Sequence, residues 1–166
     1  MDSQLFLAIN GLAAHWRWLD ELGVFLAQYF IYIFALSVAA LLIKKHYRRY
    51  VYLAIAASSI SRAVIVEVLK RWIGRARPYE HLPVHQLLTD HERSLSFPSG
   101  HAVIFFSLAF AFYGTKYFWP FFVLACLGSL ARVFVGVHYP ADIVASALIA
   151  WVVVFVLRRF FRHHFR

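Results

Sequence analysis

The sequence predicts an all-α fold: a polytopic membrane bundle of about five transmembrane helices, preceded by an N-terminal helix at the membrane interface. Of the 166 residues, 62% are hydrophobic and only 15% are charged, which is more apolar surface than a soluble domain of this size can bury. Five apolar stretches approach the length that a spanning helix needs. Because no linker or low-complexity segment divides the chain, we expect residues 1–166 to form a single integral-membrane domain.

The expected elements begin with an amphipathic interfacial helix over residues 3–18, since Trp16 and Trp18 are typical of headgroup depth. The acidic start at Asp2 does not resemble a cleaved signal peptide. The expected spans then cover residues 22–43, 50–70, 100–115, 117–136 and 140–158. The third of these is short, so we expect its outer end to begin in the protein interior.

Clusters of basic residues indicate how the spans are oriented. One cluster follows the first span (Lys44, Lys45, Arg48 and Arg49), and another follows the fifth (Arg158, Arg159, Arg162 and Arg166). By the positive-inside rule both clusters face the cytoplasm, which places the amino terminus outside. Three polar segments, at residues 70–78, 98–101 and 132–142, would then gather on the outer face, although they lie far apart in the sequence.

The formal charge of +9 predicts anionic partners: lipid headgroups, phosphates or both. We expect no nucleic-acid partner, because membrane-length apolar runs separate the basic residues. The single cysteine, Cys126, lies inside an apolar run and is interpreted as a packing residue, with no intrachain disulfide. These features leave the oligomeric state open.

The first polar segment contains Lys70 and Arg77, which are seven residues apart and would share one face of a continuing helix. Gly74 and Pro78 are expected to loosen the end of that helix and let Arg77 turn inward. A guanidinium binds two phosphate oxygens in a fork, and an ammonium supplies a mobile point charge. Taken alone, a basic helix end is more typical of a snorkelling membrane anchor.

The second segment runs from Pro98 to His101. Pro98 is expected at the first helical position, so that Ser99 and Gly100 present backbone N–H groups at the positive end of a helix, where anions bind. The Ser99 hydroxyl can add a hydrogen bond. A lone histidine at a helix start is more often a cap, but the neighbouring anion site favours His101 as a general acid.

The third segment holds the most informative pair, His138 and Asp142. With Pro140 beginning the fifth helix, Asp142 falls in its first turn and can point back at the ring of His138. A carboxylate on one ring nitrogen fixes the tautomer and leaves the other nitrogen free to attack. Arg132, six residues before His138, would complete a phosphate clamp. A helix-capping bond without chemistry is one alternative. Metal ligation is another, disfavoured because the surrounding cations would repel a metal ion.

Together, the three segments resemble the type 2 phosphatidic-acid phosphatase superfamily, whose motifs are K-x6-RP, PSGH and SR-x5-H-x3-D. The matching residues are Lys70, Arg77 and Pro78 in the first motif, residues 98–101 in the second, and Arg132, His138 and Asp142 in the third. Ala131 stands where the family has serine, which removes one hydroxyl contact to phosphate. Ser129 is a nearby candidate to replace that contact.

The resemblance implies that His138 attacks phosphorus in line and forms a phosphohistidine, while His101 protonates the leaving oxygen and then activates water. The implied catalytic residues are His138, His101 and Asp142. The implied phosphate-binding residues are Lys70, Arg77, Ser99, Gly100 and Arg132. No metal and no organic cofactor is implied.

Within the superfamily, the chain is most similar to bacterial undecaprenyl-diphosphatases of the bacitracin-resistance type, through its small size, its outward site and the segment that runs from Arg77-Pro78 through Val84-His85 to Ser96-Phe97-Pro98. This likeness implies a multi-pass protein of the bacterial plasma membrane that converts undecaprenyl diphosphate to undecaprenyl phosphate and inorganic phosphate. Phosphatidylglycerophosphate, phosphatidate and lipid A phosphate are alternative substrates. A lipid-headgroup binder or transporter without catalysis is the non-enzymatic alternative.

Several other charged residues are open to interpretation. Arg62 and Glu67 lie inside the second span, about 140° apart on an ideal helix, so we do not expect them to pair. Glu67 is expected to contact the next helical turn, at Lys70 or Arg71, and Arg62 is interpreted as structural. For Arg71, Arg75 and Arg93, binding of lipid headgroups is the alternative to a role in the site.

Overall fold

The structure, a computed structural model, describes residues 1–88 and 95–161, so the expectations for Arg93, Arg162 and Arg166 fall outside it. Within these residues all regular elements are helical. In chain order they are α1 (Asp2–Asn10), α2 (Arg17–Val24), η1 (Phe25–Tyr29), α3 (Phe30–Ala39), η2 (Ala40–Ile43), η3 (Lys45–Tyr47), α4 (Arg48–Ile60), η4 (Ser61–Val66), α5 (Glu67–Ile73), α6 (Pro78–His81), α7 (Gly100–Phe110), α8 (Phe118–Phe134) and α9 (Pro140–Phe160).

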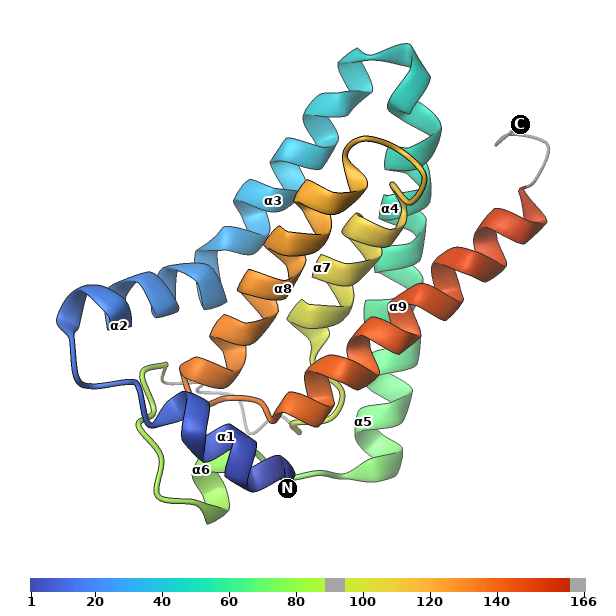
Figure 1. Cartoon of the computed structure of the whole chain (residues 1–166). Helices are drawn as coiled ribbons and strands as arrows, with labels where there is room; N and C mark the ends of the chain where they lie inside the picture. The colour runs from blue at the N-terminus through green and yellow to red at the C-terminus, as the bar shows by residue number, and fades with distance from the viewer. Residues whose placement is uncertain (89–94, 162–166) are drawn as a thin grey trace.

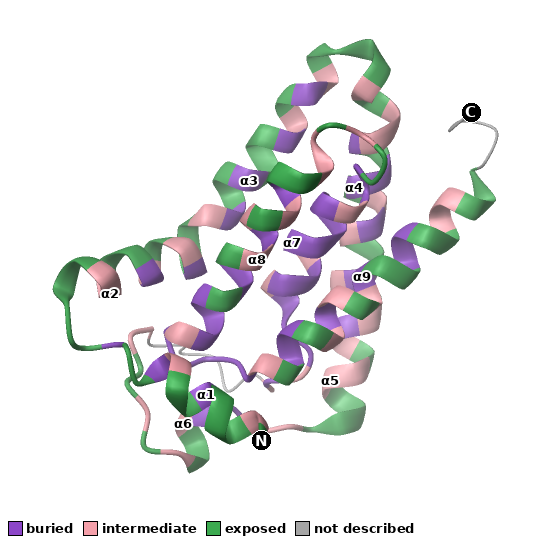
Figure 2. Cartoon of the chain, in the orientation of Figure 1, coloured by how far each residue is buried: buried purple, intermediate pink, exposed green. Residues whose placement is uncertain are grey.

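The helices α3, α4, α7, α8 and α9 form a bundle with α7 at its centre (Figure 1). The helix α7 packs against α4, α8 and α9, and eight of its 11 residues are buried. Figure 2 shows α7 mostly in the colour of buried residues. The helices α1 and α6 lie at one end of the bundle. The α3–α4 turn and the last turn of α9, which carry the basic clusters, lie at the other end (Figure 1).

Aromatic side chains fill the centre of the bundle. The ring of Phe34 lies 5.9 Å from that of Phe105 and 5.4 Å from that of Phe121, between ring centroids. The close approach of α7 to α8 requires a glycine at position 128, because a Cβ there would lie 2.6 Å from the Phe105 ring. The polar residues of the three motifs therefore lie on or next to helices whose packing is fixed by large side chains.

Three helical segments are long and apolar enough to cross a membrane: Arg17–Ile43, Lys45–His81 and Pro140–Phe160. The helices Gly100–Phe110 and Phe118–Phe134 are apolar but shorter. Large apolar side chains such as Tyr32, Leu36 and Phe155 are exposed on the outside of the bundle. The fold is that of a multi-pass, all-helical membrane protein in the described residues. The count of about five spans stays a prediction.

The prediction of one interfacial helix over residues 3–18 is wrong. The helix α1 ends at Asn10, Ala14 has a φ of 64°, and α2 begins at Arg17. The buried side chain of Asn10 explains the break. Its Nδ2 donates to the carbonyl oxygens of His85 (2.9 Å) and Phe134 (2.8 Å), and its Oδ1 accepts from the His85 N–H (2.9 Å). These bonds fasten α1 to the end of the bundle.

The first span begins earlier than predicted, because a helical run continues from Arg17 to Ile43. The π turn η1 interrupts this run between α2 and α3, and the two helices meet there at an angle (Figure 1). A π turn inside an α-helix alters the hydrogen-bond ladder and often marks a functional position. Here it lies against α8, next to the motif residue Arg132.

The expectation that Arg62 and Glu67 do not pair is also wrong. The Nη1 atom of Arg62 donates to Oε1 of Glu67, and both side chains are about two-fifths exposed. The reason is that residues 61–66 form the π turn η4. In a π turn the backbone bonds join residues five apart, so side chains at that spacing come to one face.

Candidate active site

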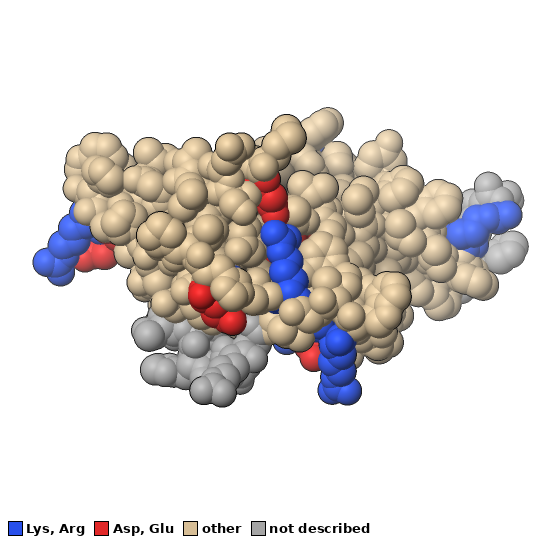
Figure 3. All heavy atoms as spheres, turned by 90° about the horizontal axis from the view of Figure 1, so that it is seen from below, with Lys and Arg blue, Asp and Glu red and all other residues tan. Residues whose placement is uncertain are grey.

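The three polar segments lie at the same end of the bundle, beside α1 and α6. Figure 3 views this end and shows acidic and basic side chains lying side by side on a surface that is otherwise mostly uncharged. Lys70 is in the last turn of α5, Arg77 caps α6, and Ser99, Gly100 and His101 begin α7. Arg132 is in the last turn of α8, His138 follows α8, and Asp142 is in the first turn of α9.

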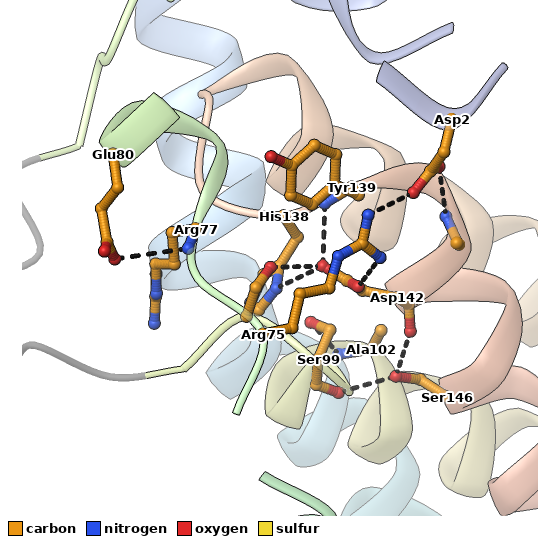
Figure 4. A network of polar contacts seen from close by, with 12 residues as sticks. Asp2, Arg75, Arg77, Glu80, Ser99, Ala102, His138, Tyr139, Asp142 and Ser146 are labelled. Carbon is orange, nitrogen blue, oxygen red and sulfur yellow. Dashed lines mark hydrogen bonds and ion pairs between the residues drawn. The ribbon is translucent and has the colours of Figure 1, made fainter. Parts of the chain in front are cut away.

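His138 and Asp142 form the centre of this arrangement (Figure 4). The Nδ1 atom of His138 lies 3.5 Å from Oδ2 of Asp142, and both side chains are almost wholly buried. The helix α9 begins at Pro140, and the Asp142 carboxylate accepts the Tyr139 N–H at 2.9 Å as a helix cap. The same carboxylate of Asp142 therefore caps α9 and lies beside the ring of His138. The Nδ1 separation is longer than a hydrogen bond and can shorten when substrate binds.

Asp142 has further partners that the sequence did not indicate. Its Oδ2 accepts the hydroxyl of the buried Ser96, and its Oδ1 accepts Nη1 of Arg75 at 2.8 Å. Arg75 also donates from Nη2 to Asp2 (Figure 4). Neither Ser96 nor Asp2 belongs to a motif, and both arrive through tertiary folding of the loop before α7 and of α1. The only sequence signal was the basic run at residues 70–77 that includes Arg75.

Burial lowers the pKa of His138 from its ordinary value, and the charges of Arg132 and Arg77 lower it further. The Asp142 carboxylate acts in the opposite direction and raises that pKa. The net lowering keeps the imidazole neutral near pH 7, with an unprotonated nitrogen available for attack. The same two arginines and His138 lie within electrostatic reach of His101, so the assignment of both histidines to one site stays a prediction that this arrangement supports.

The guanidinium of Arg132 is anchored to the first span, because its Nη1 donates to the carbonyl oxygen of Ala27 at 3.0 Å. Ala27 belongs to the π turn η1, so the irregularity in the first span supplies an anchor for this guanidinium. The side chain of Arg132 is 5% exposed, and that of Arg77 is 3% exposed. A guanidinium is suited to bind an anion, because its planar fork can donate two parallel hydrogen bonds.

The start of α7 differs from the prediction in one respect. The expectation that Pro98 occupies the first helical position is wrong, because Ser99 is the N-cap and Gly100 is the first helical residue. The Ser99 oxygen accepts the Ala102 N–H at 3.4 Å, which fixes the side chain while its own O–H remains able to donate to phosphate. The N–H groups of the first helical turn point out of the helix end, as an anion site requires.

Gly100 also lies against Arg62, and this contact gives a testable prediction. A Cβ at position 100 would lie 2.7 Å from Nε and 3.0 Å from Cδ of Arg62, whose head is held by Glu67. We expect Gly100→Ala to displace Arg62 or the start of α7 and to lower kcat/KM for phosphate release roughly tenfold to a hundredfold. Unchanged kinetics in a protein with the wild-type unfolding midpoint would show that this close approach is not needed.

The remaining predicted residues have the following surroundings. Lys70 is half-buried at the end of α5, and its membership of the phosphate clamp stays a prediction. Ala131, in place of the motif serine, packs with Ala27, Val135 and Val137 in a small apolar cluster. Ser129 is buried, and its hydroxyl makes no hydrogen bond within the described residues. Among those residues no three histidine, cysteine or acidic side chains are grouped to hold a metal ion.

Comparison with known proteins identifies relatives of this arrangement. Residues 50–166 match the model of the PAP2 superfamily. The chain is 32% identical over 164 residues to undecaprenyl-diphosphatase BcrC of Bacillus subtilis (strain 168), covering 96% of this chain and 84% of the relative. It is 38% identical over 96 residues to a lipid A 1-phosphatase of Rhizobium johnstonii, covering 53% of this chain and 39% of the relative.

A solved structure has the same architecture. The crystal structure of Aquifex aeolicus LpxE superimposes with a TM-score of 0.77 and 28% sequence identity, and 93% of each chain is covered. The superposition covers more of the chain than the part that the family model matches.

Proposed function

The chain belongs to the PAP2 superfamily, and we propose that it is a membrane lipid phosphatase that hydrolyses undecaprenyl diphosphate to undecaprenyl phosphate and inorganic phosphate. The observation that carries this proposal is a buried His138 beside the buried Asp142 carboxylate, in a site to which two arginines and a helix N-terminus contribute. A lipid-headgroup binder needs the cations but has no use for a histidine oriented in this way. The similarity to undecaprenyl-diphosphatase BcrC supports the choice of substrate.

In the proposed reaction, the Nε2 atom of His138 attacks the terminal phosphorus, and the bond from phosphorus to the bridging oxygen breaks. A protonated His101 gives its proton to that oxygen, and the lipid phosphate leaves. Water then attacks the phosphohistidine, His101 accepts a proton from it, and inorganic phosphate is released as the N–P bond breaks. Asp142 stabilises the positive charge on His138 while the phosphoryl group is attached.

The phosphate-binding residues are proposed to be Lys70, Arg77, Ser99, Gly100 and Arg132. Their cationic and N–H groups would neutralise the charge on the equatorial oxygens, which is the main requirement of phosphoryl transfer. Because protein cations supply this charge, we propose that the reaction needs no metal ion. The expected result is full phosphate release in excess EDTA, and loss of activity that added Mg²⁺ restores would contradict it.

We also propose that the site faces the extracytoplasmic side of a bacterial plasma membrane. The basic residues at the α3–α4 turn and at the end of α9 lie at the end of the bundle opposite to α1 and α6 (Figure 1). By the positive-inside rule that basic end is cytoplasmic, so the polar motifs open outward.

The test of function uses purified protein in detergent and a panel of lipid phosphates. Phosphate release is measured from undecaprenyl diphosphate, phosphatidylglycerophosphate, phosphatidate and lipid A. The proposal expects the highest kcat/KM for undecaprenyl diphosphate. A higher kcat/KM for one of the other lipids would identify that lipid as the substrate, and the proposed reaction class would stay the same. Saturable binding of lipid phosphates without turnover of any of them would instead support the binder or transporter.

A further inference from the structure

A chain of alternating charges leads from the N-terminal helix to the proposed nucleophile. Arg75 donates from Nη1 to Oδ1 of Asp142 at 2.8 Å and from Nη2 to Oδ2 of Asp2. The other carboxylate oxygen of Asp2 accepts the Ala141 N–H at 3.0 Å, which ties α1 to the first turn of α9. The guanidinium carbon of Arg75 lies 3.9 Å from the centroid of the Tyr139 ring. Figure 4 draws the hydrogen bonds that link Asp2, Arg75 and Asp142.

We propose that Arg75 and Asp2 are positioning residues, which hold the Asp142 carboxylate and set the negative charge that it presents to His138. This inference rests on the proposed function, because it assigns a role in the same site. It differs from the alternative that Arg75 binds lipid headgroups, and it is favoured by the two carboxylates that accept from the terminal nitrogens of Arg75. Neither residue is expected to touch the substrate.

The first part of the role is orientation. Arg75 holds Oδ1 of Asp142, while Ser96 and the Tyr139 N–H hold Oδ2, the oxygen nearest to His138. With both oxygens engaged, the carboxylate cannot rotate away from the ring. An arginine suits this place better than a lysine, because its planar fork spans two carboxylates and stacks on Tyr139.

The second part of the role is charge. Asp142 is wholly buried, so the charges beside it act strongly. Arg75 alone would neutralise Asp142 and weaken its stabilisation of a cationic phosphohistidine. Asp2 offsets Arg75, so that the three groups together retain one negative charge. The helix α1 therefore contributes the negative charge of Asp2 to the site, in addition to lying beside it.

Other charges also act on His138, and they are common to all variants in the test. Arg132 from α8 and Arg77 from the start of α6 lower its pKa, and His101 from α7 lies within electrostatic reach. Tyr139 and Glu80 are further titratable groups near the network in the described residues. Because these other charges are the same in every variant, a shift of the pH profile in an Arg75 or Asp2 variant measures the change in negative charge at Asp142.

The experiment measures kcat and KM for phosphate release from undecaprenyl diphosphate as a function of pH. At acid pH, kcat/KM should fall as His138 becomes protonated in the free enzyme, and this falling part of the pH profile is the acid limb. Arg75→Gln should strengthen the negative field on His138 and move this limb to higher pH, by roughly 0.5 to 2 pH units. Asp2→Asn should leave Arg75 unbalanced and move the limb to lower pH. Opposite shifts distinguish charge control from a general loss of stability.

Three further variants complete the test. Arg75→Lys keeps the charge, so its acid limb should stay at the wild-type position while kcat falls because the fork is lost. Arg75→Gln should lower kcat about tenfold to a hundredfold with little change in KM. The matched controls are Arg71→Gln and Asp20→Asn, which change exposed or peripheral charges of the same types and should leave the limb in place.

The outcomes separate the two proposals. A wild-type protein that releases no phosphate from any lipid contradicts the proposed function itself. An active wild type with no shift in either variant, or with shifts in the same direction, overturns the role of Arg75 and Asp2. A rise in KM with unchanged kcat in Arg75→Gln also overturns it, because that result identifies Arg75 as a substrate-binding residue.

Discussion

His138→Ala is expected to abolish phosphate release from undecaprenyl diphosphate, by at least about four orders of magnitude in kcat. The substitution removes the only nitrogen that the proposed mechanism uses to attack phosphorus, and the cations that remain can bind the substrate without transferring its phosphoryl group. Binding should persist, with a dissociation constant within a few-fold of the wild-type KM. Initial rates and equilibrium binding of a fluorescent polyprenyl diphosphate measure the two quantities separately.

The control for this variant is His46→Ala, which removes an exposed histidine at the opposite end of the bundle and should leave activity unchanged. Because His138 is buried, the thermal unfolding midpoint of His138→Ala is measured in the same detergent. A folded His138→Ala protein that retains wild-type kcat would show that His138 is not the nucleophile.

Asp142→Asn is expected to have the second largest effect, with kcat lowered by about three orders of magnitude and KM changed little. The amide keeps the shape of the side chain and can still accept the Tyr139 N–H, but it carries no charge to stabilise the phosphohistidine. It also replaces the carboxylate that Arg75 binds, so the charge of Arg75 is then balanced by Asp2 alone. Rapid-quench kinetics should place the loss in the formation of the phosphoenzyme.

Ser146→Ala is a suitable comparison for Asp142→Asn. The Ser146 hydroxyl lies within hydrogen-bond distance of the carbonyl oxygens of Ser99 (3.0 Å) and Asp142 (2.7 Å), so it joins the starts of α7 and α9. It should cost only about 1 kcal/mol of stability. If Asp142→Asn were no slower than Ser146→Ala, the carboxylate would serve only as a helix cap.

The motifs and the main helices could be predicted from the sequence because they depend on local patterns. Apolar runs predict helices near their observed positions, and Pro140 predicts the start of α9. The break between α1 and α2 was missed, because the buried bonds of Asn10 to His85 and Phe134 join residues 75 and 124 positions away. Hydropathy does not report such contacts.

The parts of the site that were missed have the same cause. Ser96 and Arg75 bind Asp142 from two separate segments, Asp2 binds Arg75 from a third, and none of the three stands at a motif position. The pairing of Arg62 with Glu67 was missed for a different reason, since it depends on a π turn that an ideal helical repeat does not anticipate. The residues that do the proposed chemistry could be predicted, whereas those that hold them in place could not.

The most direct test of the central claim is to trap the phosphorylated protein. Undecaprenyl diphosphate labelled with ³²P at its terminal phosphate is mixed with the enzyme, quenched within milliseconds in alkali, and the labelled peptide is identified by mass spectrometry. Our account predicts an alkali-stable, acid-labile phosphoryl group on His138, accumulating further in His101→Gln because hydrolysis of the intermediate is slowed. Label on another residue, or steady turnover with no covalent label in either protein, would contradict it.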